Sequence, residues 1–370
     1  MEIRLDFLNY LNHDVSLKIM TCLDDLCDIV RASSVSRDWL HFVIDNGLAK
    51  NLCLRMFPQL SKVDHVVEHC CIAQNPQLEA GSSNMEWETL KKEHRVYAFL
   101  ARGCMSFAES KGCITEAIMA SSTDNYPDES IENTLEELDR VGWRPSYWSS
   151  KGQSKPEVPE TLTYKLVADL CVVTEIRIKP FRAYFQLGSP IYSAKSVLFR
   201  MGHLKSDVDN FMDESFPDSL GDDFVWTYTS EEFPMAQEDS LQIFKLPEPI
   251  LCIGGILQIE LRGRVQRQEM DELFYICVAH VQVVGRPLSP PFGIDILEPS
   301  ENFVLKALSY TQPSLPQETR QDGSAESLDR HVQQPLQQMI DYLRENVVDI
   351  GILDYEFEGE DGGESDEEFL

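Results

Sequence analysis

The chain has 370 residues, of which 43% are hydrophobic and 25% charged, and its formal net charge is −30. This length suits two or three domains, and the absence of any run of 18 apolar residues predicts no membrane span. The negative charge argues against a nucleic-acid-binding surface, because phosphate contacts need clustered Lys and Arg.

The start of the chain, Met1 to Asp6, has neither the basic residues nor the apolar run of a signal peptide. The ten cysteines are scattered rather than spaced as a disulfide framework. We therefore expect an intracellular protein, in the nucleus or the cytosol, whose partners are other proteins.

Three short amphipathic helices are predicted over the first fifty residues, because apolar residues recur every three or four positions. Asp14 is the expected N-cap of the first helix, Asp24 or Asp25 opens the second, and Gly47 ends the third. Helices this short bury too little surface to be stable alone, so they need more chain or a partner. The three apolar sets are Leu11, Val15, Ile19 and Leu23; Leu26, Ile29, Val30 and Ser33; and Val35, Trp39, Phe42 and Val43.

This pattern resembles the F-box, the segment by which substrate receptors bind the Skp-type adaptor of cullin ubiquitin ligases. The departure is Leu11-Asn12, where the family usually has Leu-Pro. The alternative is a helical N-terminus that packs on the chain's own body. The matching positions are Leu11, Asp14, Val15, Ile19, Leu23, Asp28, Ile29, Val35, Arg37 and Trp39. The resemblance implies an F-box module at residues 1–58 and adaptor binding by Leu11, Val15, Ile19, Leu23, Ile29, Val35 and Trp39.

Residues 59–110 are predicted to be a helical connector. Ser61 to Leu78 carries a short helix-like stretch, and Ser83 with Glu86 has the spacing of a capping box before a stronger helix. Gly103 is the expected end of that helix. Its apolar side consists of Trp87, Leu90, His94, Tyr97 and Ala101.

One cluster has a metal-like composition: His65, His69, Cys70 and Cys71. The adjacent cysteines cannot easily reach one metal together, and no distant Cys-x-x-Cys pair completes four ligands, so we predict structural use and no metal or cofactor. Cys22 and Cys27 fall inside the helical stripes and are predicted to be core residues.

From residue 111 to 290 the pattern changes from helical to strand-like. The segments are rich in β-branched and aromatic residues and are separated by Gly, Pro, Asp or Ser. This predicts an antiparallel β-sandwich, and hence an α+β multidomain chain. The predicted strands are Thr161–Val167, Cys171–Ile178, Lys195–Arg200, Phe224–Tyr228, Leu241–Phe244, Ile256–Leu261 and Leu273–Val284.

The run from Tyr147 to Gly152, with Ala120 to Asp124 before it, resembles the galactose-binding-like (discoidin-type) jelly roll. In that family ligands meet the loops at one end of the sandwich, and its members bind sugars, lipids or proteins. The resemblance implies a binding domain without naming its ligand. Trp143 and Tyr147 are candidate target-binding or ligand-binding aromatics, and Trp148 is predicted to be in the core.

Residues 291–370 are predicted to form a Pro-rich linker, a short helix near Gln334 to Val347, and a disordered acidic tail. The last 17 residues, from Asp354, hold nine acids and no base. Such a tail serves solubility or docks a basic partner.

No phosphate-binding loop, nucleophile elbow or zinc-protease helix occurs in the sequence. We therefore expect a non-catalytic substrate receptor of an Skp-cullin-F-box (SCF) type ubiquitin ligase, whose F-box binds the adaptor and whose sandwich binds an unknown target protein. The alternative is a stand-alone carbohydrate-binding or protein-binding module without a ligase role.

Overall fold

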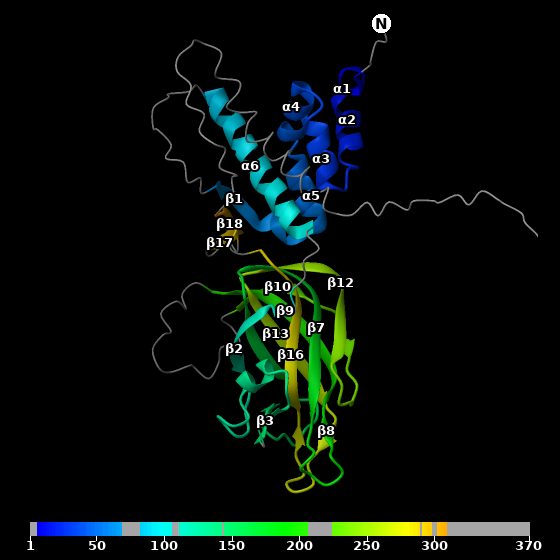
Figure 1. Cartoon of the computed structure of the whole chain (residues 1–370), viewed down its shortest axis with the longest axis vertical. Coiled ribbons are helices and arrows are strands. Elements are labelled where there is room, and N and C mark those ends of the chain that lie inside the picture. Colours follow the sequence, from blue (N-terminus) through cyan, green and yellow to red (C-terminus); the bar gives the residue numbers. More distant parts are fainter. Residues whose placement is uncertain are drawn as a thin grey trace, which may run out of the picture. The chain divides into compact units, whose positions relative to one another are not determined.

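The structure is a computed structural model. It describes residues 6–68, 82–105, 110, 112–142, 144–205, 224–288, 291–297 and 302–308. Helices dominate the first part of the chain and strands the second, as Figure 1 shows. The predicted helix near Gln334 to Val347 and the acidic tail lie outside the described residues.

Five short helices open the described chain, and two of the three predicted helix ends are confirmed. The Asp25 carboxylate accepts a hydrogen bond from the backbone N of Cys27 at 2.8 Å, and Gly47 follows a helix with a φ of 56°. The prediction for Asp14 is wrong, because Asn12 caps that helix. The helices are α1 (Phe7–Tyr10), α2 (His13–Met20), α3 (Leu26–Ser33), α4 (Arg37–Asp45) and α5 (Leu48–Met56).

A long helix, α6 (Ser82–Met105), packs against α5. Its predicted apolar side is confirmed from His94 onward, where Tyr97 and Ala101 are fully buried. The predicted end at Gly103 is wrong: a glycine inside a helix costs only about 1 kcal/mol, which the packing of the preceding turns outweighs. No helix in the described part of the chain has both the length and the apolar character to span a bilayer.

A three-stranded sheet joins residues that lie far apart in the sequence. Strand β1 (Val63–Glu68), which follows a 3₁₀ helix (Pro58–Lys62), pairs in parallel with β18 (Asn302–Ala307), and β17 (Phe292–Leu297) pairs antiparallel on the other side of β18. The helix-like stretch predicted within Ser61 to Leu78 is a strand over residues 63–68, and residues 69–78 lie outside the described residues. The predicted division at residue 290 is crossed by the pairing of β1 with β18.

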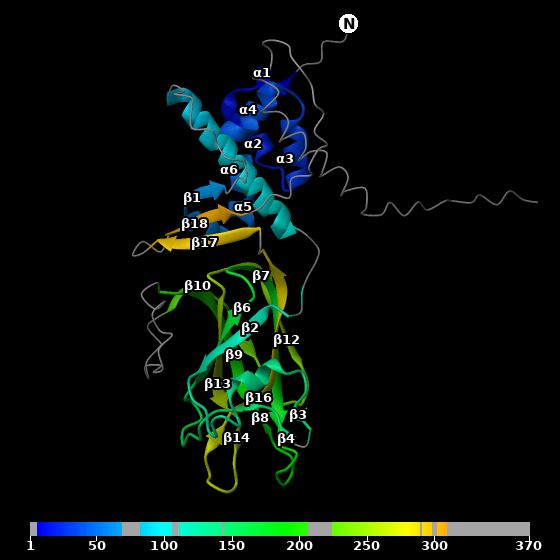
Figure 2. The ribbon, with the colours of Figure 1, turned by 60° about the vertical axis from the view of Figure 1, so that its left-hand side comes forward.

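The sandwich consists of two antiparallel sheets, as predicted (Figures 1 and 2). One has the strand order β10-β9-β13-β6-β2, with β11 on β9, and the other has the order β12-β7-β16-β5, with β8 on β7. The strands of the first sheet are β2 (Ile114–Ala120), β6 (Glu160–Leu166), β9 (Ala194–Leu204), β10 (Phe224–Thr229), β11 (Phe233–Pro234) and β13 (Ile256–Arg264). Those of the second are β5 (Trp148–Ser149), β7 (Leu170–Arg182), β8 (Ile191–Tyr192), β12 (Gln242–Ile253) and β16 (Cys277–Pro287).

The core between the sheets follows from alternation along the strands. In β7, Ile176 and Ile178 are fully buried, whereas Arg177 and Lys179 are not. The predicted strand Leu273–Val284 is in fact two strands, β15 (Phe274–Tyr275) and β16, because the backbone N of Ile276 donates to the Ser150 hydroxyl at 3.0 Å. Two further ribbons, β3 (Arg140–Val141) with β4 (Arg144–Pro145) and β14 (Gln266–Arg267) with β15, lie in the loops.

Strand β18 supplies a testable contribution to stability. Leu305 is fully buried, so Leu305→Ala should cost about 2–5 kcal/mol. Hydrogen exchange measured by mass spectrometry should quicken over β1. The matched control, Leu308→Ala, removes a 40% exposed side chain and should leave exchange unchanged. Equal exchange in both variants would contradict the importance of the β1–β18 pairing.

Helix α6 carries a buried histidine, His94. His94 is 3% exposed, and neither ring nitrogen has a hydrogen-bond partner among the described residues. Burial lowers the pKa of His94 to about 4 from its ordinary 6.5. The side chain borders a cavity of about 230 Å³ between α6 and the turn from α4 to α5, which Lys50 and Glu93 also line.

The His94 shift predicts a loss of stability in acid. Between pH 6.5 and 4 the unfolded chain binds a proton that the folded chain does not, so stability falls as the pH is lowered through this range and is fully present above it. The loss is about 3 kcal/mol. Denaturant unfolding across this range should give a flatter pH dependence for His94→Leu than for the wild type; parallel curves would refute the assignment.

Candidate functional site

The first candidate site is the outward face of α2. Val15 and Ile19 lie one turn apart on the same side of this helix and are 44% and 45% exposed. Ser16 and Met20, each the next residue and about 100° further round the helix, are 1% and 3% exposed. The helix thus leaves two β-branched residues in solvent while its buried side holds a serine beside Met20, so part of its apolar surface is not covered by the chain itself.

The other predicted adaptor-binding residues differ in their exposure. Leu11, four residues before Val15, is exposed, and so is Val35 in the turn before α4. Leu23 is half-buried. Ile29 is 1% exposed, and it therefore belongs to the core of the helices rather than to an outer surface.

Trp39 is held by the residues at the start of the described chain. Its indole Nε1 lies 3.0 Å from both carboxylate oxygens of Asp6, and its ring meets that of Phe7 edge-on with centroids 4.9 Å apart. The indole is half-buried. The structure brings Trp39 together with α1 and leaves only part of its ring for an outside partner.

The cysteines predicted to be in the core and the metal-like cluster can be compared with the described residues. Cys22 is exposed and Cys27 half-buried, so their assignment to the core is wrong; both lie near helix ends, where periodicity fails to define an inner face. His65 lies on β1 with its Nδ1 2.9 Å from an Asp64 oxygen. His69, Cys70 and Cys71 lie outside the described residues, which contain no group of His, Cys, Asp and Glu able to hold a metal.

The second candidate site is the set of loops at one end of the sandwich. Residues 121–159, 183–190, 235–241 and 265–273 all connect strands at the end opposite Ile114 and Pro287, as the strand registers require. The short strands β3 and β8 lie at this end in both views, and β4 and β14 lie there in Figure 2 (Figures 1 and 2). We call it the loop end.

The aromatic residues considered for the loop end differ in their burial and in whether the structure describes them. Tyr147 is 8% exposed, because its ring stacks on Phe181 with centroids 3.8 Å apart and its hydroxyl donates to Glu129 at 2.5 Å. It is thus unavailable to a ligand in this structure. Trp148 is fully buried, as predicted. Trp143 lies outside the described residues.

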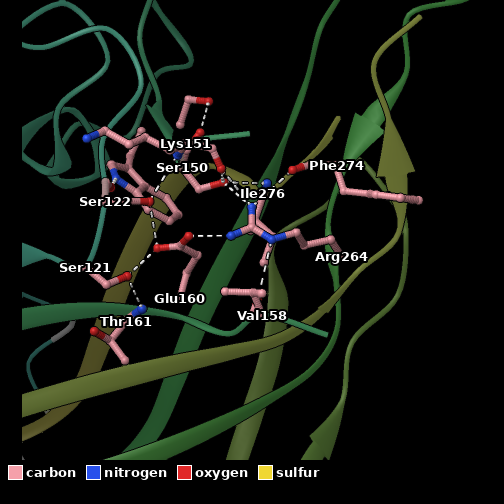
Figure 3. Close-up of polar contacts among 12 residues, drawn as sticks. Ser121, Ser122, Ser150, Lys151, Val158, Glu160, Thr161, Arg264, Phe274 and Ile276 are labelled. Atoms are coloured by element: carbon pink, nitrogen blue, oxygen red, sulfur yellow. Dashed lines mark hydrogen bonds and ion pairs between the residues drawn. The ribbon is translucent and has the colours of Figure 1, made fainter. Parts of the chain in front are cut away.

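A buried ion pair, which the sequence analysis missed, organises the loop end (Figure 3). Arg264 at the end of β13 and Glu160 at the start of β6 are 0% and 3% exposed and hydrogen-bond through Nη2 and Oε1. The only sequence signal was Gly263, whose φ of 70° breaks the alternation of β13 and turns the next side chain inward. Arg264 also donates to the Ser150 hydroxyl (2.7 Å) and to the carbonyls of Lys151 (3.1 Å), Phe274 (3.2 Å) and Val158 (3.3 Å).

The second Glu160 oxygen extends this network to the loop after β2. Ser121 and Ser122 donate their hydroxyls to Oε2, the latter at 2.8 Å. Three separate loops are therefore fastened to one pair of strands, and every charge in the pair is compensated. Such full compensation is what makes a buried ion pair tolerable.

Breaking the pair should destabilise the sandwich strongly. Glu160→Gln leaves the Arg264 guanidinium buried without its counter-charge and should cost about 3–5 kcal/mol. Glu232→Gln is the control, since its pair with Arg262 is 47% and 38% exposed and an ion pair this open to solvent contributes little to stability. Denaturant unfolding of both variants measures the difference; equal costs would contradict the role of burial.

Comparison with known proteins gives a clear relative and weaker structural likenesses. No family model matches the chain. An F-box protein of Arabidopsis thaliana is 54% identical over 316 residues, which are 84% of each chain. This identity extends well beyond the length of the helical part.

Among solved structures, the sandwich resembles carbohydrate-binding modules and a lectin. A family 32 module of a Clostridium perfringens glycoside hydrolase is 14% identical, covers 46% of this chain and 90% of its own, and has a TM-score of 0.31. The family 32 module of Clostridium perfringens NanJ in complex with galactose is 13% identical, with coverages of 48% and 99% and the same score. A fucolectin of striped bass, Morone saxatilis, is 12% identical, with coverages of 46% and 46% and a score of 0.30.

The expected likeness to galactose-binding-like sandwiches is thus found, at scores too low to support any inference about a ligand. The relative from Arabidopsis thaliana has a different weight, because more than half of the residues are identical over most of both chains. The chain belongs to the F-box protein family.

Proposed function

We propose that this chain is the substrate receptor of an SCF-type ubiquitin ligase that acts inside the cell. In this proposal the helices before residue 58 bind an Skp-type adaptor, and through it a cullin scaffold. The sandwich binds the protein to be ubiquitinated. Membership of the F-box family supports the proposal.

The observation that carries the proposal is the exposed pair of apolar residues on α2. Val15 and Ile19 are exposed while Ser16 is buried, so the isolated chain leaves apolar area in water that a partner can cover. Burial of one such side chain contributes about 1.5–3 kcal/mol. An apolar face of this kind is typical of a protein-binding surface.

The residues proposed to bind the adaptor are the exposed Leu11, Val15, Ile19 and Val35. The half-buried Leu23 and Trp39 are proposed to lie at the margin of this surface. Ile29 would act indirectly, because its side chain supports the helices from within.

The receptor would break no bond itself. By holding the target and a loaded conjugating enzyme in one assembly, it would convert a bimolecular encounter into an effectively intramolecular one. Such a role needs two binding surfaces on one chain and no nucleophile.

The test is capture of a purified Skp-type adaptor by Val15→Asp/Ile19→Asp. The double change removes two apolar contacts, together about 3 kcal/mol or more, and places charges in the interface, so affinity should fall at least about a hundredfold. Isothermal titration calorimetry with the full chain measures the loss.

Met85→Asp is the matched control, because Met85 is a 70% exposed apolar residue on α6. It should bind the adaptor like the wild type. Both variants should keep the wild-type melting profile, since the changed side chains are exposed. Wild-type affinity in the folded double variant would defeat the proposal.

A further inference from the structure

Large apolar side chains project into solvent from three of the loops at the loop end. Leu187 and Met270 are 92% and 91% exposed, and Tyr126, Leu138 and Phe185 are also more than half exposed. Single exposed apolar residues are ordinary on protein surfaces, whereas a group of them at one end of a domain marks an interaction site. We call these five residues the loop-end surface.

Packing beneath the loop-end surface holds part of it in place. The Phe185 ring lies 5.6 Å from the ring of Tyr184, which the Arg140 guanidinium covers at 3.8 Å from the ring centroid. Phe181, the fully buried partner of Tyr147, contacts both rings at 6.1 Å. An apolar anchor that is already positioned loses little freedom on binding.

The loops that carry this surface are strongly acidic. Residues 121–159, 183–190, 235–241 and 265–273 contain 13 Asp and Glu against 5 Lys and Arg. The negative charges of neighbouring loops act on each other, because partial desolvation and the charge of Asp271 raise the pKa of Asp124. The partner must therefore bring positive charge together with apolar groups.

Charge also excludes other occupants of this surface. Residues 311–370 of the chain hold 16 acids and 3 bases, so this segment would be repelled. A second copy that met the same face would be repelled for the same reason. Nucleic acid and anionic lipid carry the wrong sign.

We infer that the loop-end surface binds a segment of target polypeptide that is rich in Lys or Arg and carries Leu, Ile or Phe side chains. This inference rests on the proposed function and specifies its target class. The apolar groups of the segment would cover Phe185, Leu187 and Met270, while its basic groups would meet the surrounding carboxylates.

The experiment selects random dodecapeptides on phage against the full chain in complex with its adaptor. Enriched peptides should combine basic and apolar residues, and their affinity should fall as the salt concentration rises. Enrichment of acidic peptides, or of none, would overturn the inference. A glycan array probed with the same complex provides the second overturning outcome: sugar binding that Phe185→Ser/Leu187→Ser abolishes.

Two variants test the contributions separately with a synthetic selected peptide. Phe185→Ser/Leu187→Ser removes anchors, and Glu136→Lys/Glu137→Lys reverses exposed charges; each should weaken binding about tenfold or more. The controls Val167→Ser and Glu116→Lys/Glu248→Lys change exposed residues outside the loop end and should bind normally. Equal affinities across all four variants would overturn the inference.

Adaptor capture separates this inference from the proposed function. The loop-end variants should capture the adaptor like the wild type, because adaptor binding is assigned to α2. If the wild type captures the adaptor but selects no basic peptide, only the present inference fails. If the wild type captures no adaptor, the proposed function fails.

Discussion

The parallel pairing of β1 with β18 is the constraint on which the described architecture depends. Val63 lies opposite Phe303 and Glu68 opposite Ala307. A strand that precedes the sandwich in the sequence is thus paired with a strand that follows it. Closing a flexible loop of this length is entropically unfavourable, although the cost grows only slowly with length. A folded sandwich shortens that loop greatly, because its own chain enters and leaves at the same end. The three-stranded sheet therefore depends on the folded sandwich. The helices that pack on this sheet in turn need strands β17 and β18, which follow the sandwich in the sequence.

The Glu160–Arg264 pair is the corresponding constraint at the opposite end of the sandwich. Loops are normally the most variable and mobile parts of such a fold. Here three loop segments are hydrogen-bonded to one buried guanidinium and one buried carboxylate (Figure 3). Replacing such a pair by apolar residues is often neutral for stability, which suggests that its value lies in specifying one arrangement. The arrangement specified here is that of the loops that carry Tyr126, Leu138 and Met270, whereas Phe185 and Leu187 lie on a described loop that makes no hydrogen bond to the pair.

Periodicity predicted most of the strands and helices, because their apolar residues alternate or recur at helical spacing. It failed where a distant partner decides the structure. Val63, Val66 and Val67 become a strand only because β18 lies beside them. The stripe of Val15, Ile19 and Leu23 was visible, yet the sequence could not show that Ser16 and Met20 face inward instead. Likewise, Arg264 and Glu160 are 104 residues apart, and no local pattern connects them.

The two candidate surfaces make different physical demands, and the chain separates them accordingly. The contact proposed for the adaptor is apolar, because Val15 and Ile19 are the large apolar side chains that α2 leaves in solvent. A target must be distinguished from other proteins, and charge complementarity gives such discrimination along with a faster encounter. Two covalent connections, before residue 114 and after residue 287, join the sandwich to the three-stranded sheet and the helices, and two connections leave less freedom than one linker would. A captured segment would then be presented within a restricted volume, which raises its effective concentration at the conjugating enzyme.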